Sequence, residues 1–222
     1  MTALVRYQAA LLLRSQRWLP PVLLYAAFLV VSVQAGQPLL DSLGYAAAAL
    51  LPVTAWLVRV CATNEPAAAR HCGAAAAGAA RVHLAAVLVA LLAAVGLAAV
   101  TTLLVAVISD PHSADRQVRV PVLPAAAAGF LGALVCALLG TAVGALCNRP
   151  LLHSTGRAVP ATALAALLVL VIGGSPANAA VTGLVTGSLT GTVTLPWLPL
   201  AASAVLAAAA TATACVLSAR RP

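Results

Sequence analysis

The sequence predicts an all-α, polytopic helical membrane protein with a single transmembrane domain over residues 1–222. Of the 222 residues, 63% are hydrophobic and only 16 (12 basic plus 4 acidic) are charged, whereas about 25% of the residues in an ordinary globular domain are charged. The apolar residues form continuous runs rich in Ala, Leu and Val, and a helix needs about 20 such residues to cross a bilayer. A soluble enzyme is therefore excluded.

The first 18 residues are too charged to cross a bilayer. Arg6, Arg14 and Arg17 lie among leucine and valine side chains, a pattern typical of a helix that lies on the membrane surface. We therefore expect an interfacial helix over residues 1–18.

Six apolar runs follow this segment, and we interpret each as a membrane span. They cover residues 19–33, 43–60, 81–109, 123–147, 160–172 and 198–217. Pro52 is expected to interrupt the second span, because proline removes a hydrogen bond of the helix. Val33-Gln34-Ala35 resembles a signal-peptidase site, but the charged region before it is long for a cleaved signal, so an uncleaved span is expected.

The most charged stretch of the chain lies between the second and third spans. Thr63 can cap a helix, Pro66 is tolerated in a first helical turn, and Gly73 can end a helix. These signals predict a short helix over residues 64–72. Glu65 would then lie in its first turn, where a carboxylate suits the helix dipole.

Two sets of glycines recur at helical intervals. Gly132, Gly140 and Gly144 share one face of the fourth span, which favours close helix contact, either within one subunit or at a dimer seam. Gly183, Gly187 and Gly191 follow threonines at intervals of four. They predict either a smooth helical ridge or a flexible external loop in residues 175–195.

The composition excludes several kinds of chemistry. All 12 basic residues are arginine, so the chain lacks the lysine of a Walker A loop and the lysine of a Schiff-base enzyme. The five cysteines contain no C-x-x-C pair and are interpreted as packing thiols. The polar loop at residues 110–119 has no ligand spacing of a known metal site. We therefore expect no enzyme activity, no metal and no cofactor in this chain.

The positions of the arginines predict the topology. With the N-terminus inside, ten arginines fall on interior segments, and only Arg116 and Arg119 fall outside. Positive charge prefers the cytoplasmic side, so both termini are expected to be cytoplasmic. The expected location is the plasma membrane. Because the arginines lie at the ends of apolar runs, they are interpreted as a topology signal, and no nucleic acid is expected as a partner. The four carboxylates lie in loops or at span ends, which argues against a proton-coupled carrier.

This order of elements resembles one family. An amphipathic N-terminal helix, six spans, a charged helix before the third span and a polar insertion before the sixth are similar to the membrane subunit of type-2 ATP-binding-cassette (ABC-2) exporters. The resemblance covers the whole chain in architecture. Its local motif runs from Asn64-Glu65 to Arg81, where Ala77-Gly78-Ala79-Ala80 stands in place of the family's Pro-x-x-Arg step.

The resemblance implies a function and a set of partners. The chain would be an export permease that forms the substrate path, and a separate ATPase subunit would bind the ATP. A second permease copy or a related permease would complete the path, within membrane lipid. By analogy, residues 175–195 would form the external gate, and the residues that couple to the ATPase would be Asn64, Glu65, Arg70, His71 and Arg81. The alternative is a membrane-embedded scaffold or regulatory subunit without a transport path.

Overall fold

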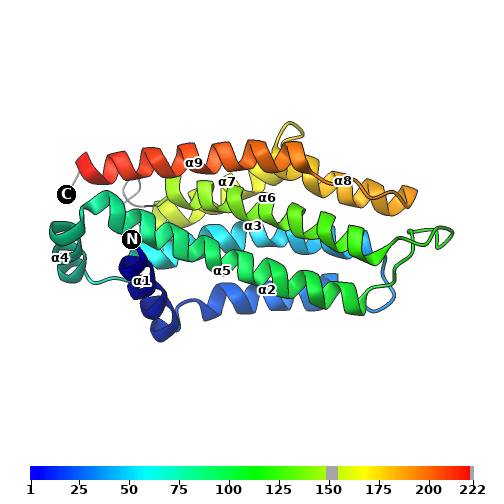
Figure 1. Cartoon of the computed structure of the whole chain (residues 1–222), viewed down its shortest axis with the longest axis horizontal. Helices are drawn as coiled ribbons and strands as arrows, with labels where there is room; N and C mark the ends of the chain where they lie inside the picture. The colour runs from blue at the N-terminus through cyan, green and yellow to red at the C-terminus, as the bar shows by residue number, and fades with distance from the viewer. Residues whose placement is uncertain (149–154, 221–222) are drawn as a thin grey trace.

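The computed structural model describes residues 1–148 and 155–220, and these residues form α-helices joined by short connections (Figure 1). The helices are α1 (Thr2–Ser15), α2 (Leu19–Ser32), α3 (Leu39–Thr63), α4 (Ala67–Ala77), α5 (Ala79–Ile108), α6 (Val122–Leu146), α7 (Thr155–Val171), α8 (Pro176–Thr190) and α9 (Trp197–Arg220). Within the described ranges, β-pairing is limited to two isolated bridges. The all-α prediction is therefore confirmed. Arg149 and Arg221, which the topology prediction counts as interior, lie outside the described residues.

Four helices are long and apolar enough to cross a membrane. They are α3, α5, α6 and α9, and α7 with α8 adds a fifth candidate that is bent by 50°. The predicted first span is α2, which has only 14 residues and is about 21 Å long at 1.5 Å per residue. A bilayer core is about 30 Å thick. The structure therefore indicates a membrane-embedded helical protein with four to five spanning helices.

Helix α3 lies at the centre of the bundle and contacts α1, α2, α5, α6, α7 and α8. It begins at Leu39, earlier than expected, where the Leu39 amide donates to the Asp110 carbonyl at 3.0 Å. The helix also continues through Pro52 to Thr63, so the expected interruption is wrong. Packing around most of its circumference holds α3 together, and Pro52 lies on its exposed side. The fully buried side chains of α3 include Leu39, Leu40, Leu50, Leu51, Thr54, Leu57 and Val58.

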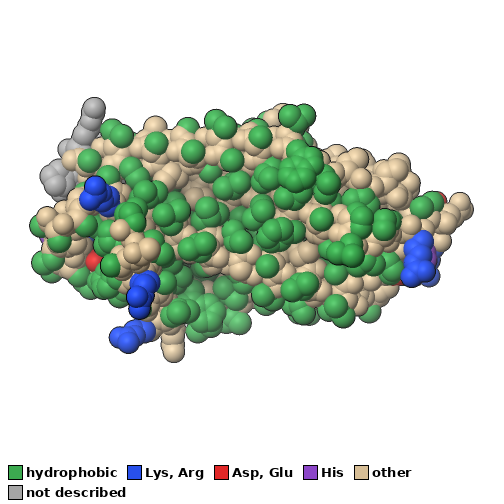
Figure 2. Space-filling view, viewed as in Figure 1, with side chains coloured by type: hydrophobic (Ala, Val, Ile, Leu, Met, Phe, Trp, Pro, Cys, Tyr) green, Lys and Arg blue, Asp and Glu red, His purple; other side chains and the backbone are tan. Residues whose placement is uncertain are grey.

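The ends of the bundle differ in composition from its middle. The start of α1, helix α4 and the end of α9 lie at one end, and the connection between α5 and α6 lies at the other (Figure 1). On the face shown in Figure 2, arginine side chains gather at these two ends and hydrophobic side chains cover the surface between them. This distribution matches a protein whose middle lies in lipid.

Hydrogen bonds within the bend between α7 and α8 pair several of its backbone groups. The Asn178 side-chain amide donates to the Leu170 carbonyl at 2.8 Å, and the Ser175 amide donates to the Ile172 carbonyl at 2.9 Å. The Ser175 hydroxyl in turn accepts from the Ala177 amide at 3.2 Å and caps α8. The two helices therefore change direction without leaving these polar groups unpaired.

Candidate functional site

The short helix between α3 and α5 differs from the predicted one. It is α4, which begins at Ala67 and ends at Ala77, before Gly78 with a φ of 89°. Gly73 lies inside the helix, and Glu65 precedes it instead of lying in its first turn. Thr63 ends α3 and donates to the Arg59 carbonyl at 2.8 Å, so it does not cap α4. The predicted range of 64–72 is therefore wrong by about a turn.

Glu65 points toward the N-terminal helix. Its carboxylate accepts hydrogen bonds from the Tyr7 hydroxyl on Oε1 and from the Gln8 side-chain amide on Oε2, both at 3.2 Å. The Glu65 side chain is only 7% exposed, and Gln8 is 3% exposed. A buried carboxylate is costly unless it accepts hydrogen bonds, and here α1 provides them.

The neighbouring residues strengthen the same contact. The Asn64 side-chain amide donates to the Leu11 carbonyl of α1 at 3.1 Å. Partial burial, and after it the Glu65 charge, raise the pKa of Tyr7 above its ordinary value. A phenol is already protonated at neutral pH, and the shift extends to higher pH the range in which Tyr7 can donate to Glu65. We call this group of Tyr7, Gln8, Asn64 and Glu65 the α1 anchor.

The five residues expected to couple to an ATPase thus have three kinds of surroundings. Asn64 and Glu65 face α1, whereas the His71 and Arg81 side chains are exposed. Arg70 is half-buried, and its Nε has no hydrogen-bond partner among the described residues. No local sequence pattern could identify Tyr7 and Gln8 as the partners of Glu65. Tyr7 is 58 positions and Gln8 57 positions from Glu65 in the sequence.

The exposed side of α4 is small and mostly apolar. It carries His71 and Cys72 beside three alanines at helical spacing, Ala68, Ala75 and Ala76. The opposite side of the helix packs toward α5. Helix α4 therefore presents a shallow surface at the end of the bundle, in which His71 is the largest side chain.

A second polar contact at this end was not predicted. Arg59 of α3 donates from its guanidinium to Asn148 Oδ1 at 2.9 Å. The Asn148 amide donates to the Gly144 carbonyl at 2.8 Å, and its side chain is buried. The contact joins the C-terminal part of α3 to the end of α6. An arginine near a span end is also the ordinary topology signal, so the sequence did not single it out.

Gly140 and Gly144 of α6 pack against α3 within the subunit. A Cβ on Gly140 would collide with the Leu51 carbonyl oxygen, and one on Gly144 would come within 2.7 Å of the Val58 Cβ. Gly132 faces Leu184 of α8 instead. These glycines let the helix backbones approach closely.

Residues 175–195, for which the sequence predicts either a helical ridge or a flexible loop, contain the helix α8. The three glycines of this segment have different surroundings. A Cβ on Gly183 would meet only the Thr194 hydroxyl, at 3.9 Å, whereas one on Gly187 would lie 2.5 Å from the Thr192 carbonyl oxygen. Gly191 ends α8 with a φ of 68° under the Val118 side chain. The three glycines therefore do not form one exposed ridge.

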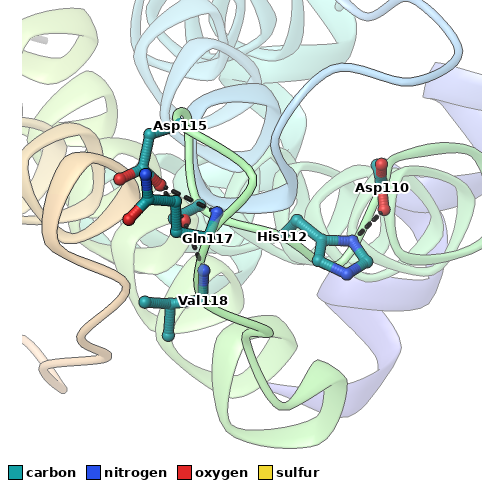
Figure 3. Close-up of polar contacts among 6 residues, drawn as sticks. Asp110, His112, Asp115, Gln117 and Val118 are labelled. Atoms are coloured by element: carbon teal, nitrogen blue, oxygen red, sulfur yellow. Dashed lines mark hydrogen bonds and ion pairs between the residues drawn. The ribbon is translucent and has the colours of Figure 1, made fainter.

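Polar side chains of the connection between α5 and α6 bond to one another and to its backbone (Figure 3). Asp110 pairs with the His112 ring at 2.5 Å. Asp115 accepts from the Ser113 hydroxyl at 2.5 Å and from the Gln117 amide at 3.1 Å. These bonds lower the pKa of Asp115, the Ser113 hydroxyl more than the Gln117 amide.

This connection also contacts α8, because the Ala114 amide donates to the Ser188 carbonyl at 2.9 Å. Across residues 1–148 and 155–220, no three His, Cys, Asp or Glu side chains come close enough to hold a metal ion. The five cysteines are all free thiols.

Comparisons with protein-family models, with curated proteins and with solved structures give no match to this chain.

Proposed function

We propose that this chain is the permease subunit of an ABC-2-type exporter, with six membrane passes, cytoplasmic termini and a separate ATPase subunit as its source of energy. The observation that supports it best is the placement of α1 and α4 together at one end of the bundle. There α4 joins two long apolar helices, α3 and α5, and exposes one face away from them. A permease without its own ATPase must receive the driving motion through such a surface.

The path of the chain supports an even number of passes. The start of α1 and the end of α9 lie at the same end of the bundle (Figure 1). Helix α2 would provide the first pass although it is short, with its flanking segments completing the crossing. The bent pair of α7 and α8 would provide the fifth pass and the external gate.

The geometry changes which residues we propose for the ATPase contact. Because both Glu65 carboxylate oxygens accept from α1, Glu65 would position α4 relative to α1 and would not touch the ATPase. The contact would be made by the exposed side of α4, with His71 and Cys72 at its centre. Arg81, exposed at the start of α5, would lie at its edge.

Co-purification tests this proposal. The chain is co-expressed with a candidate ABC ATPase, extracted in detergent and purified through a tag on the permease. We expect the ATPase to remain bound and to hydrolyse ATP, and we expect a Walker A lysine variant of the ATPase to remain bound without hydrolysis. If no ABC ATPase is retained in detergent or in nanodiscs, the alternative of a membrane scaffold or regulatory subunit is favoured.

Two substitutions then locate the contact. Ala75→Trp places a large side chain on the exposed side of α4 and should abolish ATPase retention. Arg116→Trp places the same side chain at the opposite end of the bundle and should leave retention unchanged. Equal retention by both variants would exclude α4 as the docking surface.

A further inference from the structure

The exposed side of α1 carries arginines at helical spacing. Arg6, Ala10 and Arg14 follow one another at intervals of four and are all exposed, and Arg17 is exposed just beyond the helix. The opposite side of α1 is buried through Gln8 and Leu12. We call Arg6, Arg14 and Arg17 the basic face of α1.

Among the described residues, no carboxylate forms an ion pair with this basic face. Glu65 is the acidic side chain beside α1, and it is buried with both oxygens accepting from Tyr7 and Gln8. The ion pair found in the described parts of the chain joins Asp110 to His112, at the other end of the bundle. The three guanidinium groups are thus available to an external anion.

The basic face lies where the lipid-facing surface begins. Helix α2 starts at Leu19, two positions after Arg17, and its early side chains Leu23 and Leu24 are 62% and 57% exposed. Leu13, next to Arg14, is 67% exposed. Helix α1 runs across the end of the bundle (Figure 1), so arginines and apolar side chains occupy the same level.

We propose that the basic face of α1 binds the phosphate groups of anionic phospholipids. A guanidinium can donate two parallel hydrogen bonds to a phosphate, and the neighbouring Leu13 suits the acyl boundary below the headgroups. An acidic protein would match the charge but not the exposed leucines that continue into α2. The proposal depends on the membrane location of the chain and not on export.

The native tryptophan between α1 and α2 provides the probe. Trp18 follows Arg17, and its indole donates to the Leu13 carbonyl at 3.5 Å. With Trp56→Phe and Trp197→Phe, Trp18 is the single tryptophan of the chain. The protein is reconstituted in two sets of phosphatidylcholine vesicles. One set contains brominated phosphatidylglycerol and the other the same fraction of brominated phosphatidylcholine. The quenching of Trp18 is compared between the two sets.

We expect the anionic lipid to quench Trp18 more strongly, with a local preference of up to about fivefold for each arginine that contacts a headgroup. The preference should fall at high salt and disappear in Arg6→Gln/Arg14→Gln/Arg17→Gln. The matched control, Arg116→Gln/Arg119→Gln at the other end, should keep it. Circular dichroism and gel filtration verify that each variant is folded.

Two results would overturn the proposal. Equal quenching by the two brominated lipids would show that α1 lies at the membrane without selecting anionic headgroups. Quenching by neither lipid would place α1 away from the membrane, and the basic face would then be a surface for an acidic protein.

Discussion

Gln8 and Glu65 are 57 positions apart in the sequence and meet in the fold, where the Gln8 amide donates to the Glu65 carboxylate at 3.2 Å. Both side chains are buried. The contact connects the N-terminal helix to the segment that leads into α4. A displacement of α4 would therefore be transmitted to α1.

The first prediction tests this anchor. Glu65→Ala removes the acceptor of Gln8 and leaves a buried amide unpaired, which costs about 1–3 kcal/mol. We expect α1 to detach locally while the long helices stay intact, with faster hydrogen exchange in residues 2–15. His71→Ala, an exposed change on the same segment, is the control and should leave that exchange unchanged. Unchanged exchange in both variants would show that other contacts hold α1.

The second prediction concerns the contact between α6 and α3. Gly140→Ala adds a Cβ that collides with the Leu51 carbonyl oxygen, and such overpacking costs about 1–3 kcal/mol. Gly96→Ala, on the exposed side of α5 with no atom within 4 Å of the added Cβ, should instead be neutral or stabilise by about 0.5–1 kcal/mol. Thermal unfolding in detergent measures the two effects. Equal midpoints would mean that α6 and α3 are farther apart in the membrane.

The third prediction separates two glycines of α8. Gly187→Ala brings a Cβ to 2.5 Å from the Thr192 carbonyl oxygen, whereas Gly183→Ala meets only the Thr194 hydroxyl at 3.9 Å. We expect Gly187→Ala to loosen the turn after α8 and increase proteolysis in residues 190–196. Gly183→Ala should be cleaved like the parent, and a reversed order would contradict the fold of this segment.

The fourth prediction is a pH dependence at the connection between α5 and α6. The bonds from Ser113 and Gln117 lower the pKa of Asp115 below its ordinary value of 3.8. A carboxyl whose pKa is lower in the folded state stabilises that state above about pH 4, and the contribution is lost as the pH falls through the folded pKa. A spin label at position 116 should therefore become more mobile in strong acid.

The control for this effect is isosteric. Asp115→Asn should make the label mobile already at neutral pH and reduce its response to acid, while Asp110→Asn controls for the other carboxylate of the connection. A full acid response in Asp115→Asn would assign the effect to another group.

The fifth prediction is the topology. In a variant without the native cysteines, single cysteines at Gln34, Gln117 and Thr186 should react with an impermeant reagent outside the cell. Those at Ala10 and His71 should react only after the membrane is opened. These five positions are exposed in the structure, so labelling reports sidedness and not burial. External labelling of His71 would overturn the topology predicted from the arginines.

The helical class was predictable because apolar runs determine which segments leave water. The close approach at Gly140 and Gly144 was also anticipated, since small residues at intervals of four form a smooth helix face. The sequence could not decide which neighbour uses that face. That choice depends on contacts between α3 and α6, which are distant in the chain.

The predicted site was less accurate around Asn64 and Glu65. Local rules placed Thr63 at the cap and Glu65 in the first turn of a helix over residues 64–72. In the structure the side chains of Asn64 and Glu65 bond to α1 instead. The buried Glu65 carboxylate thereby keeps hydrogen-bond partners. The start of α4 consequently moves to Ala67. No local pattern contains Tyr7 or Gln8, so this contact could only be found in three dimensions.

The hydrogen bonds within the bend between α7 and α8 have a further consequence for biogenesis. Asn178 and Ser175 satisfy the Leu170 carbonyl and the Ala177 amide from inside the segment itself. The bend does not need water or a neighbouring helix for these bonds, so the bent pair can enter hydrocarbon before the rest of the bundle has assembled. A translocon could therefore release α7 and α8 together as one preformed unit, and α9 could pack against them afterwards.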